Sequence, residues 1–217
     1  MSDSAVSVSA VKASAASAPA RKPAGIILAA GTSSRMGRDK ALLPFRGSTF
    51  LNHLIALLSS KTDPLIVVLG HNAGTIRKTL PAGTRIVVNQ CYELGMLSSL
   101  QTGLRALPVE ANSALFTPVD HPAVRGETID SLIAAFHRSG QPLVIPRYEG
   151  RRGHPAILSR EILDAILDLS PGASAKDVIR SHRHHTFFLD TADPGILSDI
   201  DLPADYQALI ARDEPAL

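Results

Sequence analysis

The sequence is poor in cysteine, in long apolar stretches and in excess charge of either sign. Cys91 is its one cysteine, which excludes an internal disulfide or a site with several thiolate ligands and fits a reducing cytoplasm. No apolar run approaches the roughly 20 residues of a membrane-spanning helix. The formal net charge is +2, too small to indicate nucleic-acid binding. These absences predict a cytoplasmic protein without nucleic-acid or membrane partners.

Residues 1–24 differ in composition from the rest of the chain. They are mostly Ala, Ser and Val without helical or strand periodicity, and they carry too few large apolar groups to offset chain entropy. Serine interrupts every apolar run that a secretory signal would need. We therefore expect a disordered tail over 1–24 and a single domain over 25–217.

From Gly25 onward, short β-branched runs alternate with amphipathic segments, which is typical of βαβ units. The predicted strands cover residues 25–30, 65–70, 85–89, 113–119, 142–146 and 185–190. The predicted helices cover residues 48–60, 72–80, 96–107, 126–138, 159–168 and 174–182, with a last one after Pro203. The alternation predicts a three-layer α/β/α fold around a mostly parallel, Rossmann-like sheet.

Ligands of such sheets bind at the carboxyl ends of the strands. The segment after the first strand, "GTSSRMG", is neither a Walker A loop nor a GxGxxG turn. Ala29, Ala30 and Gly31 are nevertheless small enough for an anion to approach the backbone. Arg35 and Lys40 add the charges expected around a triphosphate. The alternative is a surface loop with solvated cations.

Carboxylates follow later strands. Asp120 lies in "PVDHP" between two prolines, and a carboxylate held there suits Mg²⁺; the alternative is a turn or capping residue. Asp199 and Asp201 in "SDIDLPAD" lie on one side of an extended segment. One of them is expected to share the metal with Asp120, unless Asp201 only caps the helix that begins at Pro203.

Five motifs together resemble the MobA-like nucleotidyltransferase family, and within it the molybdenum cofactor cytidylyltransferases. They are "LAAGTSSRMGRDK", "PVDHP", "NQCYELGMLSS", "GRRGHP" and "DIDLPAD". The likeness runs from about residue 25 to 210 and implies a fold of the nucleotide-diphospho-sugar transferase type. Leu202 and Ala204 depart from the Thr and Glu that are usual in the last motif. Ala30 replaces a Gly of guanylyl-transferring relatives, which indicates CTP as the donor.

The resemblance implies a role for each matching residue. The nucleotide would be held by Leu28, Ala29, Ala30, Gly31, Thr32, Arg35, Lys40, Asn89, Ser98 and Ser99. Mg²⁺ or Mn²⁺ would be bound by Asp120 with Asp199 or Asp201, and catalysis would rest on Arg35, Lys40 and Asp120. The acceptor would be bound by Arg151, Arg152, Gly153 and His154. The alternatives are a turn residue for Asn89, a helix start for Ser98 and Ser99, and a structural histidine for His154.

The implied reaction transfers CMP from CTP to the phosphate of molybdopterin and releases pyrophosphate. A phosphomonoester with a second pKa near ~6 is largely ionised at neutral pH, so no general base is needed. Alternatives are another phosphorylated acceptor, GTP as donor, or a non-catalytic nucleotide-binding maturation factor that contacts a molybdoenzyme. Some relatives have oxidoreductase roles, but a nicotinamide-type GxGxxG is absent.

Overall fold

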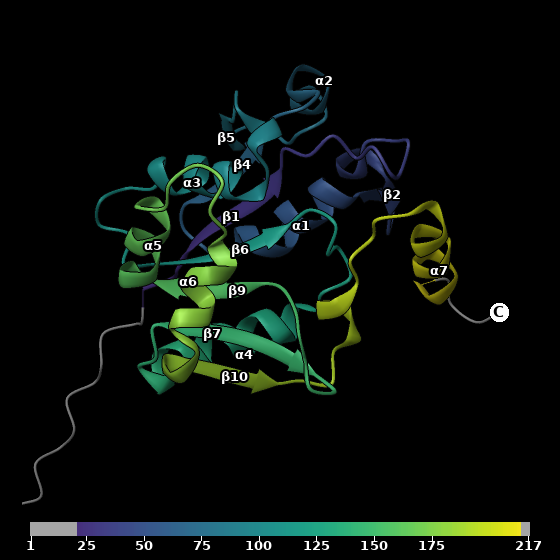
Figure 1. Ribbon diagram of the computed structural model, residues 1–217. Coiled ribbons are helices and arrows are strands. Elements are labelled where there is room, and N and C mark those ends of the chain that lie inside the picture. The colour runs from purple at the N-terminus through teal and green to yellow at the C-terminus, as the bar shows by residue number, and fades with distance from the viewer. Residues whose placement is uncertain (1–20, 214–217) are drawn as a thin grey trace, which may run out of the picture.

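The computed structural model describes residues 21–213 and has an eight-stranded sheet at its centre (Figure 1). The predicted tail lies outside the described residues for positions 1–20. The strand order is β10-β7-β9-β6-β1-β4-β5, and β8 pairs with β7 at one end. The strands are β1 (Ala24–Ala29), β4 (Leu65–Leu69), β5 (Arg85–Val88), β6 (Ser113–Pro118), β7 (Leu143–Tyr148), β8 (Arg151–Arg152), β9 (Ala156–Ser159) and β10 (Thr186–Asp190).

Helices cover both faces of this sheet, so the predicted three-layer fold is confirmed. Each face has its own apolar core, one beneath α3, α5 and α6 and the other beneath α1 and α4. The helices are α1 (Phe50–Ser59), α2 (Ala73–Arg77), α3 (Met96–Arg105), α4 (Gly126–Ser139), α5 (Arg160–Leu167), α6 (Ala175–Ser181) and α7 (Pro203–Asp213). Each predicted helix and strand has a counterpart among these elements. Between residues 21 and 213 no helix combines the length and apolarity needed to cross a bilayer.

The sequence did not predict β9, which is antiparallel to both of its neighbours, β6 and β7. Its four residues, "AILS", run directly into α5 without a connecting loop. Ser159 was expected to begin that helix, and it does occupy the N-cap position, although its side chain makes no capping hydrogen bond. A strand this short leaves too little alternation to be separated from the helix that follows it.

The segment after β10 returns across the carboxyl ends of the central strands. A 3-10 turn, η4 (Pro194–Leu197), brings the Ile196 carbonyl oxygen within 3.0 Å of the His154 amide. Further along, the Ile200 amide donates to the Asp120 carbonyl oxygen at 3.0 Å. Gly153 permits this approach, because a Cβ atom there would lie 2.2 Å from the Ile196 oxygen. The "GRRGHP" motif therefore fixes the segment that carries Asp199.

Replacing Gly153 with Ala is expected to destabilise the fold by about 1–3 kcal/mol, because backbone at Ile196 must move to accommodate the new methyl group. Gly74→Ala in α2 is the matched control: no atom lies within 4 Å of its added Cβ, so it should leave stability unchanged or slightly raised. Urea denaturation of both variants measures the difference. Equal midpoints for Gly153→Ala and Gly74→Ala would contradict the close approach.

Candidate nucleotide and metal site

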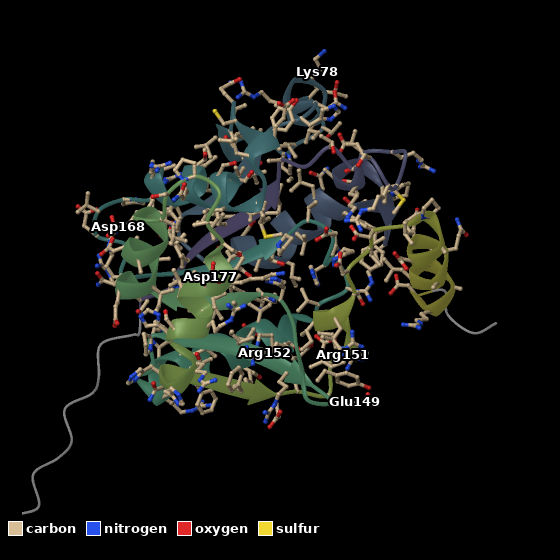
Figure 2. The ribbon with its side chains drawn as sticks, viewed as in Figure 1. Lys78, Glu149, Arg151, Arg152, Asp168 and Asp177 are labelled. Carbon is tan, nitrogen blue, oxygen red and sulfur yellow. The ribbon has the colours of Figure 1, made fainter. Side chains whose placement is uncertain are left out.

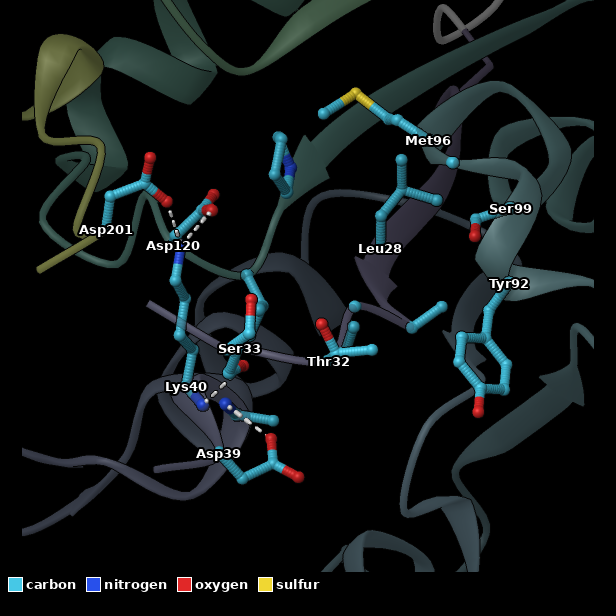
Figure 3. Close-up of a pocket in the computed structure, with 18 of the residues that line it drawn as sticks. Leu28, Thr32, Ser33, Asp39, Lys40, Tyr92, Met96, Ser99, Asp120 and Asp201 are labelled. Atoms are coloured by element: carbon cyan, nitrogen blue, oxygen red, sulfur yellow. Dashed lines mark hydrogen bonds and ion pairs between the residues drawn. The ribbon is translucent and has the colours of Figure 1, made fainter. Parts of the chain in front are cut away.

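The loop after β1 forms one wall of a cavity of about 390 Å³ at the carboxyl edge of the sheet (Figure 3). Residues 28–34, all small except Leu28, line one side, and the opposite side is lined by Tyr92, Glu93, Gly95 and Met96. No atom lies within 4 Å of a Cβ built on Gly31, so the backbone there is open to a ligand. Lys40, Asp120 and Asp201 close one end of the cavity. The loop predicted to hold phosphate thus borders a cavity.

Lys40 is the centre of an ion-pair cluster at this end of the cavity. Its ammonium donates to Asp120 Oδ2 at 2.9 Å and to Asp201 Oδ1 at 2.5 Å, as Figure 3 shows. The Arg35 guanidinium lies 2.7 Å from the other Asp201 oxygen and is largely exposed. The Ser33 hydroxyl accepts from the Lys40 amide at 3.1 Å, which holds the loop to the lysine. Residues far apart in the sequence therefore meet here.

The charges in this cluster shift one another's protonation. Burial lowers the pKa of Lys40, but the negative charges of Asp120 and Asp201 outweigh it, so the pKa lies above its usual value. Lys40 therefore carries its positive charge throughout the physiological pH range. The hydrogen bond from Lys40, more than the nearby Arg35, holds the pKa of Asp201 below its usual range.

A second cluster lies on the other side of Asp120. One donor atom from each of Asp120, His121 and Asp199 lies within 4.8 Å of the others. Burial, followed by the charges of Asp120 and Asp201, raises the pKa of Asp199, whereas burial lowers the pKa of His121. A neutral imidazole and clustered carboxylates are suitable ligands for a divalent cation. The donor set therefore fits a metal ion.

The two C-terminal aspartates have different surroundings. Asp201 binds Lys40 and Arg35, and it does not cap α7. The carboxylate that binds backbone at this helix start is that of Asp205, in the first turn of α7, whose Oδ2 accepts from the Asp201 amide at 3.1 Å and the Leu202 amide at 2.7 Å. Of the alternatives that the sequence left open for Asp201, helix capping is wrong.

Asn89, Ser98 and Ser99 form a hydrogen-bonded group behind the cavity. The buried Asn89 amide donates to the two serine hydroxyls at 2.8 and 3.0 Å, and its oxygen accepts from the Cys91 amide. Ser99 lines the cavity, whereas Asn89 and Ser98 do not. The hydrogen bonds of Asn89 join the chain after β5 to the first turn of α3, which fixes the far wall of the cavity.

Tyr92 was not singled out in the sequence, although it lines the cavity. A Cβ atom on Gly70 would lie 2.7 Å from the Tyr92 Cβ and 2.9 Å from the Ala30 Cβ, so this glycine lets the two side chains approach. The His71 ring packs edge-on against Tyr92, with centroids 5.9 Å apart. The sequence signal for Tyr92 is its type and place, since it is an aromatic residue shortly after the strand predicted at residues 85–89.

The residues of "GRRGHP" divide between two further cavities. Arg152, Gly153 and His154 line one, of about 520 Å³, and Arg151 lines the other, of about 450 Å³; neither borders Lys40. Figure 2 shows the two arginines side by side near the turn after β7. Adjacent strand residues point to opposite faces, so the two guanidiniums of β8 serve different surfaces.

His154 lies between the cavity that it lines and the cluster of Asp120, His121 and Asp199. Its ring centroid lies 4.9 Å from that of His121 and 5.2 Å from that of Phe116. Burial, with a smaller contribution from His121, lowers the pKa of His154 to about 3, so the ring is neutral at physiological pH. The two imidazole rings therefore lie between the carboxylates of Asp120 and Asp199 and the cavity of about 520 Å³.

Comparison with known families gives a match over residues 25–186 to the MobA-like NTP transferase domain. The chain belongs to this family. The resemblance predicted from the five motifs is confirmed, and with it the enzyme class, nucleotidyltransferase. Some relatives are named molybdenum cofactor cytidylyltransferase, and others are named probable molybdenum cofactor guanylyltransferase.

Three curated relatives of this MobA-like protein carry different names. Nicotine blue oxidoreductase of Paenarthrobacter nicotinovorans is 33% identical over 189 residues, covering 82% of this chain and 91% of the relative. A probable molybdenum cofactor guanylyltransferase of Mycobacterium avium is 33% identical, with coverages of 71% and 78%. The molybdenum cofactor cytidylyltransferase of Escherichia coli is 26% identical, with coverages of 83% and 92%.

Solved structures have the same fold. A mycobacterial homologue of Rv0371c from strain JC1 aligns with a TM-score of 0.77 and 30% identity, covering 87% of this chain and 95% of that one. Rv0371c of Mycobacterium tuberculosis in complex with manganese aligns with a TM-score of 0.73 and 27% identity, covering 88% and 98%.

Lys40→Met is expected to raise the pKa of Asp201, because it removes the hydrogen bond that lowers this pKa most. Arg35→Met, which removes a more exposed partner, should raise it less. Carboxyl NMR titration of the ligand-free protein measures both shifts. A larger rise in Arg35→Met would contradict this order.

The lowered pKa of Asp201 also gives stability a pH dependence. The stabilisation is complete above the unfolded-state pKa of about 3.9 and is lost as the pH falls through the folded-state pKa. Wild type and Lys40→Met should therefore differ less in unfolding free energy in acid than at pH 7. Urea denaturation at several pH values between acid and pH 7 measures the difference in unfolding free energy between the two proteins. A difference that grows in acid would contradict a lowered pKa of Asp201.

Proposed function

We propose that the protein transfers CMP from CTP to the phosphate of molybdopterin and releases pyrophosphate. The observation that carries the proposal is the cluster of Lys40, Asp120 and Asp201 at one end of a cavity with an open, small-residue wall. Cations beside accessible backbone amides suit a triphosphate. The names of the relatives agree with a nucleotide donor and a molybdopterin-type acceptor.

The donor would lie across the loop between Leu28 and Lys40. Gly31 leaves room for phosphate oxygens, and Lys40 and Arg35 supply positive charge where the pyrophosphate leaves. Ala30 and Tyr92 both line the cavity, and the Ala30 methyl group takes up space that a glycine at this position would leave open. A narrower pocket favours a pyrimidine over a purine, which supports CTP as the donor.

We assign the metal to Asp120 and Asp199, with His121 beside them, and assign Asp201 to holding Lys40 and Arg35. Mg²⁺ or Mn²⁺ fits this donor set, and a homologous structure is described as a complex with manganese. When bound, such an ion neutralises phosphate charge. The raised pKa of Asp199 beside other carboxylates agrees with a site whose charge is balanced by a cation.

The reaction needs little proton chemistry from the protein. An oxygen of the acceptor phosphate attacks the α-phosphorus of CTP, and the bond from that phosphorus to the bridging oxygen of pyrophosphate breaks. The attacking phosphate is already ionised at neutral pH. Lys40, charged because of its raised pKa, and Arg35 then stabilise the charge that develops on the leaving pyrophosphate.

Lys40→Ala and Asp120→Ala should each lower kcat/KM by about 100-fold or more, the usual effect of removing a group that stabilises transition-state charge. Asp130→Asn is the matched control, because Asp130 of α4 is exposed and pairs with Lys61, which follows α1, away from the cavity. The assay measures pyrophosphate release from Mg-CTP, Mg-GTP and Mg-ATP, with and without molybdopterin, in folded variants.

The same assay separates the competing functions. Release from CTP only in the presence of molybdopterin supports the proposal. Release with GTP, or with a different phosphorylated acceptor, changes the substrate but keeps the enzyme class. Nucleotide binding without any release favours a maturation factor for a molybdoenzyme, and near wild-type turnover in Lys40→Ala would overturn the mechanism.

Asp199→Asn should weaken Mn²⁺ binding more than Asp201→Asn, because Asp199 shares the cluster with Asp120 and His121, whereas Asp201 is paired with two cations. Electron paramagnetic resonance titration of free Mn²⁺ in the absence of nucleotide measures both affinities. If Asp201→Asn weakened Mn²⁺ binding more, Asp201 and not Asp199 would be the metal ligand.

A further inference from the structure

Asp193 is a buried carboxylate that has no part in the proposed reaction. Only 2% of this residue is exposed, and it directly precedes the η4 turn. Its two oxygens bind two different segments of the chain. Oδ1 accepts from the Gly195 amide of η4 at 2.8 Å, and Oδ2 accepts from the Arg125 amide, at the start of α4, at 2.8 Å. One side chain therefore joins η4 to the end of the loop after β6.

Further groups compensate the buried charge of Asp193. The Thr128 hydroxyl, in the first turn of α4, donates to Oδ2 at 2.7 Å, and the Arg125 guanidinium lies 3.7 Å from Oδ1. The carboxylate also lies at the N-terminus of a 14-residue helix, where the helix dipole favours a negative charge. A buried charge with these partners is costly to displace, so we expect the two joined segments to move together.

Each of the joined segments carries one part of the cluster of Asp120, His121 and Asp199. Asp120 and His121 lie on the loop that leads from β6 to Arg125, and Asp199 follows η4. One donor atom from each of the three lies within 4.8 Å of the others. Asp193 is not one of these three residues and does not line the cavity of about 390 Å³. Its effect on the cluster therefore passes through the backbone.

Backbone contacts carry this join to Asp199. A Cβ on Gly195 would lie 2.2 Å from the Ala123 oxygen, so the glycine that donates to the buried carboxylate also packs η4 closely against the loop after β6. Beyond the turn, the Ile200 amide donates to the Asp120 carbonyl oxygen at 3.0 Å. The short segment that carries Asp199 is thus held to the same loop at both of its ends.

We propose that Asp193 is a positioning residue that sets the spacing of Asp120 and Asp199, and through it the affinity of this pair for a divalent cation. The inference rests on the proposed metal site. Mg²⁺ requires ligand oxygens at about 2.0–2.1 Å in a near-octahedral arrangement, and functional groups must be held within about 0.5 Å of their working positions. A carboxylate that binds both segments at once supplies that precision.

Asp193→Asn should weaken Mn²⁺ binding about 10-fold, the usual order of effect when a group that orients a metal ligand is lost. Asparagine has nearly the same size, but its single oxygen accepts from only one of the two backbone amides. Thr128→Val is the matched control, because it removes one hydrogen bond to the same carboxylate and leaves both amides bound. It should change the affinity much less. Electron paramagnetic resonance titration of free Mn²⁺ without nucleotide measures both affinities.

A second control separates positioning from a general loss of stability. The buried Gln101 side chain of α3 donates at 2.9 Å to the carbonyl oxygens of Ile166 and Leu169, at the end of α5, and it does not line the cavity of about 390 Å³. Gln101→Leu should therefore lower the midpoint of urea denaturation without changing Mn²⁺ affinity. If Gln101→Leu weakens Mn²⁺ binding as much as Asp193→Asn, the positioning role is overturned.

Amide hydrogen exchange tests the join in the absence of a metal. The Ile200 amide, which donates to the Asp120 carbonyl oxygen, should exchange about 10-fold faster in Asp193→Asn than in Thr128→Val, because the segment opens more often once it is released from the loop after β6. Equal exchange rates in the two variants would overturn the inference, whatever the transferase activity.

The two measurements distinguish this inference from the proposed metal site. If Ile200 exchange rises as expected but Asp199→Asn leaves Mn²⁺ affinity unchanged, Asp193 still spaces the two carboxylates and the metal assignment fails. If Asp199→Asn weakens Mn²⁺ binding and Asp193→Asn does not, the metal assignment stands and the positioning role fails.

Discussion

The ion-pair cluster of Lys40 with Asp120 and Asp201 is the interaction on which the site depends. It joins the loop after β1, the loop after β6 and the segment before α7, which are otherwise separate in sequence. A buried ammonium requires such partners, because an uncompensated charge in the interior is costly. Lys40 therefore has two roles at one position: it holds three segments together, and it supplies positive charge at the cavity wall.

Backbone contacts and the side-chain hydrogen bonds of the buried Asp193 hold the segment that leads to the C-terminal carboxylates. Gly153 touches the Ile196 carbonyl, and a Cβ on Gly195 would lie 2.2 Å from the Ala123 oxygen. These contacts fix the segment from residue 194 to 201 against the loop that follows β6. The glycine of a motif expected to meet the acceptor thus also positions the proposed metal ligands.

Two cavities lie near the edge of the sheet at which β6 ends. The cavity of about 390 Å³ is lined by the ends of β1 and β6 and the loops that follow them. The cavity of about 520 Å³ is lined by Phe116 of β6, Ile145 of β7 and Ala156 of β9. The His121 and His154 rings lie 4.9 Å apart at the boundary between the two. The antiparallel β9 widens the sheet at the second cavity and places the small Ala156 beneath α6.

The sequence by itself determined the alternating elements and the polar residues that follow each strand, because strand and helix periodicities and strand ends are local properties. The positions of Lys40, Arg35 and Asp120 after two predicted strands are enough to predict that they lie at one edge of the sheet. Only the tertiary structure decided that Asp201 pairs with Lys40 while Asp199 joins His121, and that Arg151 and Arg152 line different cavities. Those choices depend on how η4 and β8 pack against distant strands, and no local pattern encodes that packing.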